Sequence, residues 1–136
     1  MDLRLNEILI KEELKLKELL ELLDKQYQLI LKKDVFALES LVEEMKIKNK
    51  EVAEVEVERR KLLGNNSIKE YILKSNNEDL DKSYRNINKL LNEMILQKDT
   101  NDLLIKQQLS FTNKLLNIMN PKKEASVYNS YGNIRR

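Results

Sequence analysis

Only two glycines and one proline occur in the 136 residues of this chain, at Gly64, Gly132 and Pro121. These residue types interrupt helices and form the turns that join strands. Their scarcity leaves little room for a chain of short strands and favours a few long helices. The breakers also mark where we expect helices to end, near Gly64 and just before Pro121.

The apolar residues of the first segment are spaced as on one face of a helix. Most lie three, four or seven positions apart, a pattern that predicts an amphipathic helix over residues 2–32. The residues of this face are Leu5, Leu9, Leu16, Leu19, Leu23, Tyr27 and Ile30. Leu20, Leu22 and Leu31 widen the stripe, so we expect this helix to contact more than one neighbour.

A second helix is expected after Asp34, whose side chain can accept a hydrogen bond from a free N–H of the first turn. The break between the two helices contains no Gly or Pro, which leaves open a kink or a loop. The alternating valines of residues 51–58 resemble a strand, but an isolated strand would have no partner here, so we predict helix. The apolar face of this helix comprises Leu38, Leu41, Met45, Val52, Val55 and Leu62.

Two Ser-x-x-Glu patterns, which start at Ser67 and Ser75, have the spacing of a capping box. They predict a short helix or helical turn over residues 67–75 and a long helix over about 78–119. The seam of the long helix is polar in its middle, at Asn101. Its apolar positions are Leu80, Tyr84, Ile87, Leu91, Met94, Ile105, Leu115 and Met119.

Pro121 lacks an N–H and restricts the residue before it, so the last helix should end there. We therefore expect a helical domain over residues 1–120 and a flexible, polar tail over residues 121–136. A helix of about 30 residues is roughly 45 Å long. The expected fold is all-α, an elongated antiparallel helical hairpin or three-helix bundle with coiled-coil-like packing. Such a thin bundle should leave part of its apolar stripe available to a partner.

Composition excludes several classes of function. The 25 basic and 23 acidic residues give a net charge of +2, so we expect no nucleic-acid partner. The absence of Cys and His excludes disulfides, zinc sites built on thiolate or imidazole, and catalysis by Ser–His or Cys–His pairs. With no Gly-rich phosphate loop either, we expect no enzyme, no cofactor and no metal site. No apolar run is long enough for a signal peptide or a membrane span, which predicts a cytoplasmic location without membrane insertion.

Three polar features allow more than one interpretation. The basic cluster of residues 59–61 could dock an acidic partner, but cations near a helix C-terminus are the favoured explanation. Asn101 could bond a partner or set register inside a bundle. Tyr128 and Tyr131 lie in a polar tail, where an exposed tyrosine is either an interface anchor or inert.

Several stretches resemble the FlgN family of flagellar export chaperones. In the second half, residues 101–109 resemble the family's Asn followed by an aliphatic cluster, and residues 115–121 resemble its helix end and Pro. Residues 127–132 resemble its short tail motif, a Tyr with a Gly four residues later. Order and spacing agree without a gap from 101 to 132. In the first half the resemblance rests on Tyr27-x-Leu29-Ile30, Leu38-x-x-Leu41 and Glu58-Arg59-Arg60-x-Leu62.

The resemblance implies a cytosolic chaperone that binds hook-filament junction (hook-associated) proteins, prevents their premature assembly and delivers them to the type III export gate. The bound cargo element would be an amphipathic terminal helix. Tyr128 and Gly132 are expected to dock at the cytosolic domain of the gate. The residues expected to bind cargo are Asn101, Leu104, Ile105, Gln108, Leu109, Leu115, Leu116 and Met119.

Three other functions compete with this hypothesis. A sibling flagellar chaperone would have a similar fold and another cargo. A helical coiled-coil scaffold would self-associate strongly and ignore flagellar cargo, whereas the chaperone hypothesis allows only weak self-association. A nucleic-acid-binding helical protein would need a basic face, which the balanced charges argue against.

Overall fold

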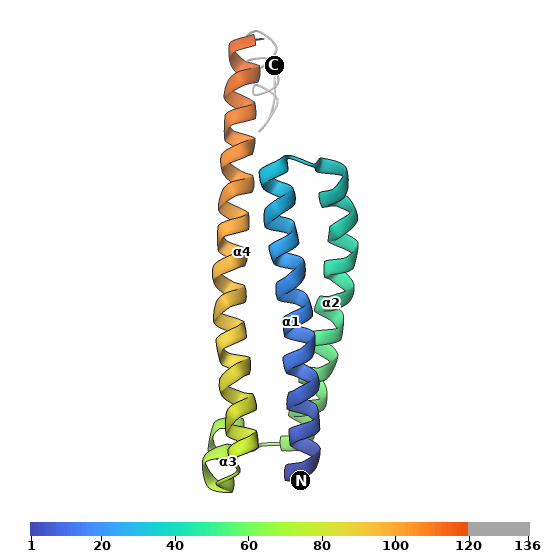
Figure 1. The fold of residues 1–136 in the computed structure, drawn as a ribbon, viewed down its shortest axis with the longest axis vertical. Coiled ribbons are helices and arrows are strands. Elements are labelled where there is room, and N and C mark those ends of the chain that lie inside the picture. Colours follow the sequence, from blue (N-terminus) through green and yellow to red (C-terminus); the bar gives the residue numbers. More distant parts are fainter. Residues whose placement is uncertain (120–136) are drawn as a thin grey trace. The chain divides into compact units, whose positions relative to one another are not determined.

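The computed structural model describes residues 1–119, which form four helices (Figure 1). Their bounds are α1 Asp2–Lys32, α2 Val35–Leu63, α3 Ile68–Ser75 and α4 Glu78–Met119. None of the described residues lies in a strand, so the all-α prediction is confirmed, including for the valine-rich residues 51–58. The boundary and tail expected at residues 120–136 lie outside the described residues. The chain forms two units, the first comprising Met1–Asn101 and the second beginning at Asp102.

A two-residue turn, rather than a kink, joins α1 to α2. Lys33 adopts the left-handed conformation (φ 59°, ψ 34°) and donates its N–H to the carbonyl of Ile30 at 3.0 Å. The N–H of Asp34 bonds the carbonyl of Leu29 at 3.1 Å. The side chain of Asp34 then caps α2 by accepting the N–H of Ala37 at 3.1 Å. The predicted cap is confirmed, and the left-handed residue explains how the chain reverses without a glycine.

In the first unit, consecutive long helices run antiparallel, as predicted. Between α1 and α2, Lys11 pairs with Glu58 at 3.1 Å and Lys15 pairs with Glu51 at 2.9 Å. The later residue of α1 therefore pairs with the earlier residue of α2, as expected for antiparallel helices. The start of α2 lies beside the end of α1.

The first part of α4 runs parallel to α1. Asn86 donates to the carboxylate of Glu13 at 3.5 Å, and Asn101 donates to the carbonyl of Leu23 at 3.0 Å. Later residues of α1 pair with later residues of α4, as expected for parallel helices. The chain returns through α2 and α3, so α4 begins at the same end of the unit as α1. Three long helices of alternating direction form this unit, with α3 at the crossover.

The two predicted capping boxes are absent, which corrects the sequence analysis. Ser67 precedes α3, but its side chain makes no capping bond. Ser75 still belongs to α3 and donates its hydroxyl to the carbonyl of Ile72 at 2.8 Å. Asn77 caps α4 instead, because it directly precedes the helix and its side-chain oxygen accepts the N–H of Leu80 at 3.3 Å.

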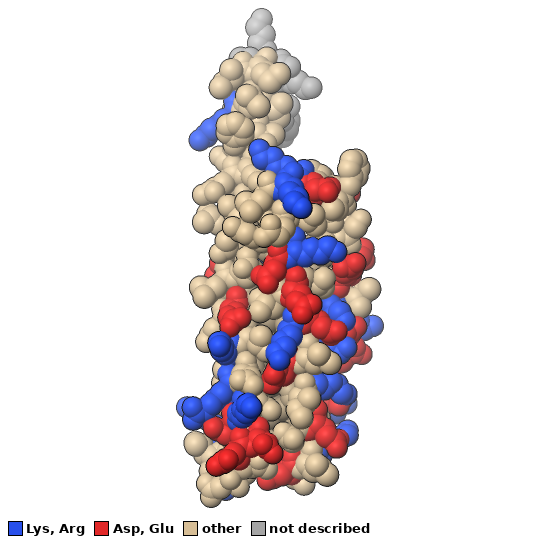
Figure 2. Space-filling model, in the orientation of Figure 1, with Lys and Arg blue, Asp and Glu red and all other residues tan. Residues whose placement is uncertain are grey.

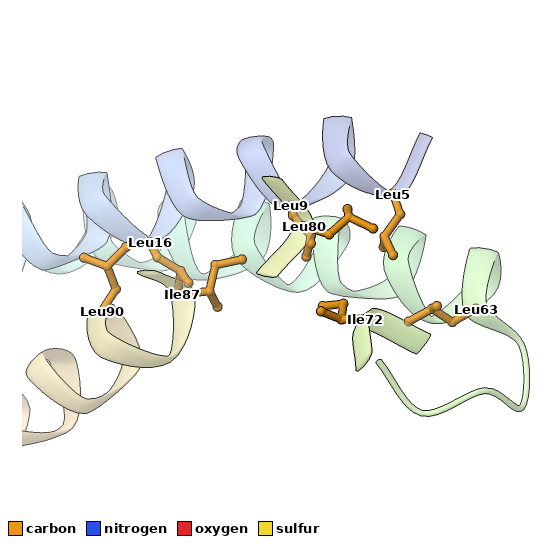
Figure 3. Packing of buried hydrophobic residues seen from close by; sticks show 8 residues of the cluster. All are labelled: Leu5, Leu9, Leu16, Leu63, Ile72, Leu80, Ile87 and Leu90. Carbon is orange, nitrogen blue, oxygen red and sulfur yellow. The ribbon is translucent and has the colours of Figure 1, made fainter. Parts of the chain in front are cut away.

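The core of the first unit is aliphatic and involves all four helices (Figure 3). Figure 3 shows side chains of α1 and α4 directed toward one another, with Leu63 of α2 and Ile72 of α3 near the start of α1. The sequence pattern misplaced two contacts by one residue, because Leu63 and Leu90 are buried instead of Leu62 and Leu91. The buried cluster consists of Leu5, Leu9, Leu16, Leu63, Ile72, Leu80, Ile87 and Leu90.

A buried ion pair interrupts the apolar face of α1. Glu12 is only 6% exposed, and its Oε1 lies 3.3 Å from Nε of Arg59 on α2. Burial raises the pKa of the Glu12 carboxyl, against the opposing attraction of Arg59. Arg60 pairs with Glu56 one turn earlier in α2. Both arginines of the basic cluster therefore have acidic partners within the chain, which disfavours a free patch for an acidic protein.

Asp2 ties the first turn of α1 to the crossover. Its carboxylate accepts hydrogen bonds from the hydroxyl of Tyr71 on α3 and from the side-chain amide of Asn77 at 3.4 Å. The bond from Tyr71 lowers the pKa of the Asp2 carboxyl below its ordinary value of 3.8. This bond should therefore stabilise the folded state only while Asp2 is ionised.

Acidification should remove this contribution. A carboxyl whose folded pKa is lowered stabilises the protein above its unfolded pKa, and the stabilisation is lost as pH falls through the folded pKa. We expect the free energy of unfolding of the wild type to fall more steeply than that of Asp2→Asn below about pH 4. Urea denaturation of both proteins at neutral and acidic pH measures the difference. Parallel losses in the two proteins would show that the bond does not persist in solution.

Candidate protein-binding surface

Residues 102–119 form the last turns of α4, and most of their large apolar side chains are exposed. The exposed fractions range from 45% to 78%. Figure 2 shows few Lys, Arg, Asp or Glu side chains over this part of the helix on the face in view. The exposed residues are Leu103, Leu109, Phe111, Leu115, Leu116, Ile118 and Met119. So many exposed apolar side chains in one short segment are typical of a surface that binds a partner.

Most of the predicted cargo residues lie on one side of this segment. Leu104, Ile105 and Gln108 are half-buried, and the others are exposed. Steps of three, four and seven positions connect them, so they share one broad side of an α-helix. We call this surface the cargo face, and it comprises Leu104, Ile105, Gln108, Leu109, Leu115, Leu116 and Met119.

Asn101 differs from these residues because it is 1% exposed. Its side-chain NH₂ donates to the carbonyl of Leu23 at 3.0 Å and to Oε1 of Gln26 at 2.9 Å. Its side-chain oxygen accepts a hydrogen bond from Gln97 at 3.0 Å. Direct contact with cargo would require this network to open. The arrangement fits the alternative in which a buried amide sets the register of two helices, and we leave Asn101 out of the cargo face.

The sequence analysis missed Leu103, Phe111 and Ile118, which are 56%, 61% and 78% exposed. Phe111 and Ile118 adjoin the cargo face, because they lie four positions before and three positions after Leu115. The seven-position step from Phe111 to Ile118 was the available signal, since such a step returns to nearly the same side of a helix.

A smaller exposed apolar patch lies at the turn between α1 and α2. It comprises Leu31, Val35 and Phe36, of which Phe36 is 84% exposed. Neither this patch nor the cargo face contains a group that could act as a nucleophile with a neighbouring base. Both surfaces are suited to binding apolar side chains of another protein.

Other predicted features concern tail residues, metals and membranes. Tyr128 and Gly132 lie outside the described residues. Among residues 1–119, no cluster of acidic side chains is arranged to hold a metal ion. No helix in the same range is long and apolar enough to cross a membrane.

A family model described as "FlgN protein" matches the chain over residues 1–136. The match includes the segment from residue 101 to residue 132, on which the resemblance was strongest, as well as the helices of the first half. Comparison with curated proteins and with solved structures gave no match.

Proposed function

The chain belongs to the FlgN family of non-enzymatic flagellar export chaperones for hook-associated proteins, and from this premise we propose that the cargo face of α4 is where the cargo binds. The observation that carries the proposal is the exposure of this face. Four of its residues, Leu109, Leu115, Leu116 and Met119, are at least 45% exposed. An apolar helix face left open in the free protein is suited to cover an apolar helix of another protein.

The occupant of the cargo face is an amphipathic helix from a terminal region of the hook-associated protein. Such a helix exposes an apolar stripe before assembly and would associate with other copies. The cargo face extends over 16 residues, from 104 to 119, or roughly 24 Å at 1.5 Å per residue. A contact of this size between two apolar helix faces shields the stripe and prevents premature assembly.

The modest size of the interface also suits release. Small interfaces lie at the weak end of specific complexes, so cargo can leave when a competing site captures it. The receiving site in this proposal is the cytosolic domain of the export gate, which places the chaperone in the cytoplasm. Tyr128 and Gly132 serve this docking step, because they match the tail motif of the family resemblance.

Binding measurements with purified proteins test the cargo assignment. The chain should bind full-length hook-associated proteins and lose affinity when their terminal helical segments are removed. A sibling chaperone would instead prefer another flagellar protein, and a coiled-coil scaffold would bind none of them. Calorimetric titration against several flagellar proteins therefore separates the three hypotheses. Preference for a cargo other than the hook-associated proteins would contradict the proposal.

Substitution of Tyr128 should separate docking from cargo binding. We expect Tyr128→Ala to weaken binding of the chaperone–cargo complex to the gate domain about thirtyfold, or about 2 kcal/mol, because an aromatic anchor is lost. Cargo affinity and the free energy of unfolding should stay close to wild type. Tyr131→Ala is the matched control, since Tyr131 lies in the same tail. Equal losses for cargo and gate, or no loss for the gate, would contradict the docking role.

A further inference from the structure

Asn101 is the last residue of the first unit, directly before the segment of α4 that carries the cargo face. Its buried side chain joins α4 to α1, because its NH₂ group donates to the carbonyl of Leu23 and to Oε1 of Gln26. Its oxygen accepts a hydrogen bond from Gln97. A buried amide with these partners in place favours one relative position of the two helices, since a shift would leave the amide unpaired.

The stripe of α4 that packs in the first unit continues, by spacing, into the cargo face. Leu90, Met94, Gln97 and Asn101 follow one another at steps of four, three and four positions. The next such steps reach residues 104–108, where the cargo face begins. Leu90 and Asn101 are 9% and 1% exposed, so this side of α4 is covered where it lies in the first unit. The side that we propose for cargo therefore extends a side that already packs on the chain itself.

α4 continues further than α1 does. From Asn101 to Met119 it has 18 more residues, whereas α1 ends at Lys32, nine residues beyond Leu23. A shift of the α1–α2 hairpin toward the end of α4 would bring apolar side chains of α1 over exposed ones such as Leu115. Burial of apolar surface favours this shift, and the shift would close the cargo face. A specific contact is therefore needed to hold the hairpin where it lies.

Gln26 is the side-chain acceptor for Asn101 at the observed position. A shift of the hairpin toward the end of α4 by three, four or seven positions would put a leucine in that place. These leucines are Leu23, Leu22 and Leu19. No leucine side chain accepts a hydrogen bond, so the amide of Asn101 would be buried without this partner, at a cost in free energy. One pair of residues therefore disfavours all three shifts.

We infer that Asn101, paired with Gln26, is a positioning residue for cargo binding, because it holds α1 at one register on α4 and keeps the cargo face open. This inference rests on the proposed role of that face. In helix pairs, a buried asparagine specifies register at a cost in stability. A leucine at this position should therefore preserve or raise stability, while cargo binding weakens because a shifted population has its cargo face covered.

Asn101→Leu tests both parts of this expectation. The urea midpoint should equal that of the wild type or rise, whereas the affinity for full-length hook-associated proteins should fall at least about tenfold. Gln26→Leu removes the same bond from the side of α1 and should act in the same direction. Ser83→Ala is the matched control, since Ser83 is a polar residue of α4 that is 9% exposed and lies outside this pair. Its cargo affinity should equal that of the wild type.

Pulsed electron paramagnetic resonance measures the register directly. The chain contains no cysteine, so Glu21→Cys on α1 and Lys82→Cys on α4 provide two exposed sites for nitroxide labels. Glu13 of α1 lies opposite Asn86 of α4. A shift of the hairpin toward the end of α4 would therefore carry Glu21 away from Lys82.

With Asn101 in place, the two labels should show one distance. In the Asn101→Leu background a second distance should appear, longer by roughly 5–10 Å, as expected for a shift of three to seven positions at 1.5 Å per residue. Saturating cargo should suppress the longer distance, because cargo binds only the form whose cargo face is open. A residue that merely stabilised the fold would not produce this response.

Three results would overturn the inference. One is a single, unchanged distance in both leucine variants. Another is a lower urea midpoint that accompanies the loss of cargo affinity, which would mark Asn101 as an ordinary core residue. The third is a longer distance that saturating cargo leaves unchanged. The label distances are first measured without cargo, so they report the register separately from serine substitutions at Leu115 and Leu116, which test whether the cargo face binds cargo.

Discussion

Replacing Leu115 and Leu116 with serine should lower the affinity of the chaperone for its hook-associated cargo about a hundredfold or more. Both side chains are about half exposed in the described structure, and in our proposal the cargo helix covers them. Loss of roughly 1.5 kcal/mol of apolar burial at each leucine gives about 3 kcal/mol in total. Calorimetric titration with the full-length cargo measures this loss.

A matched control separates the cargo face from apolar surface in general. Ile10→Ser with Leu14→Ser removes two exposed side chains of similar kind from α1 and should leave cargo affinity unchanged. Both double variants should keep the helical content of the wild type. Unchanged cargo binding in a folded Leu115→Ser, Leu116→Ser variant would move the cargo site elsewhere. Unfolding of that variant would show that these leucines belong to a core.

The second large effect concerns stability. Leu16→Ala should reduce the free energy of unfolding by about 3 kcal/mol, because Leu16 is 1% exposed and packs in the cluster between α1 and α4. A loss of this size is a large fraction of the 5–15 kcal/mol that holds a typical domain together. Urea denaturation followed by circular dichroism measures the change.

Leu14→Ala is the control for this prediction, two residues away on the same helix. Its side chain is 54% exposed, so the substitution should change stability by no more than about 0.5 kcal/mol. The same chemical change at neighbouring positions then reports only on burial. Equal destabilisation by the two variants would contradict the packing of α1 described here.

Several predicted features were confirmed because their causes are local. Scarce Gly and Pro, together with three- and four-residue spacing, predicted the long helices near their observed bounds. Asp34 was recognisable as a cap because a cap needs only the first free N–H groups of its own helix. The cargo-face residues were named on the family resemblance of residues 101–132, and their role in binding cargo stays a prediction.

Other features were decided only by contacts between distant parts of the chain. Leu90 rather than Leu91 is buried, because the neighbouring helix selects among adjacent apolar residues. Asn101 is buried by its bond to the carbonyl of Leu23, 78 positions away. Sequence spacing cannot distinguish such an internal amide from a free one.

The sequence by itself determined the helices and the aliphatic character of the core. The tertiary structure decided which side of each helix in the first unit is covered. Spacing specifies which residues share a side of a helix, but burial depends on whether another helix occupies that side. That Leu90 is buried while Leu91 is exposed therefore became visible only from the packing of the helices in the first unit.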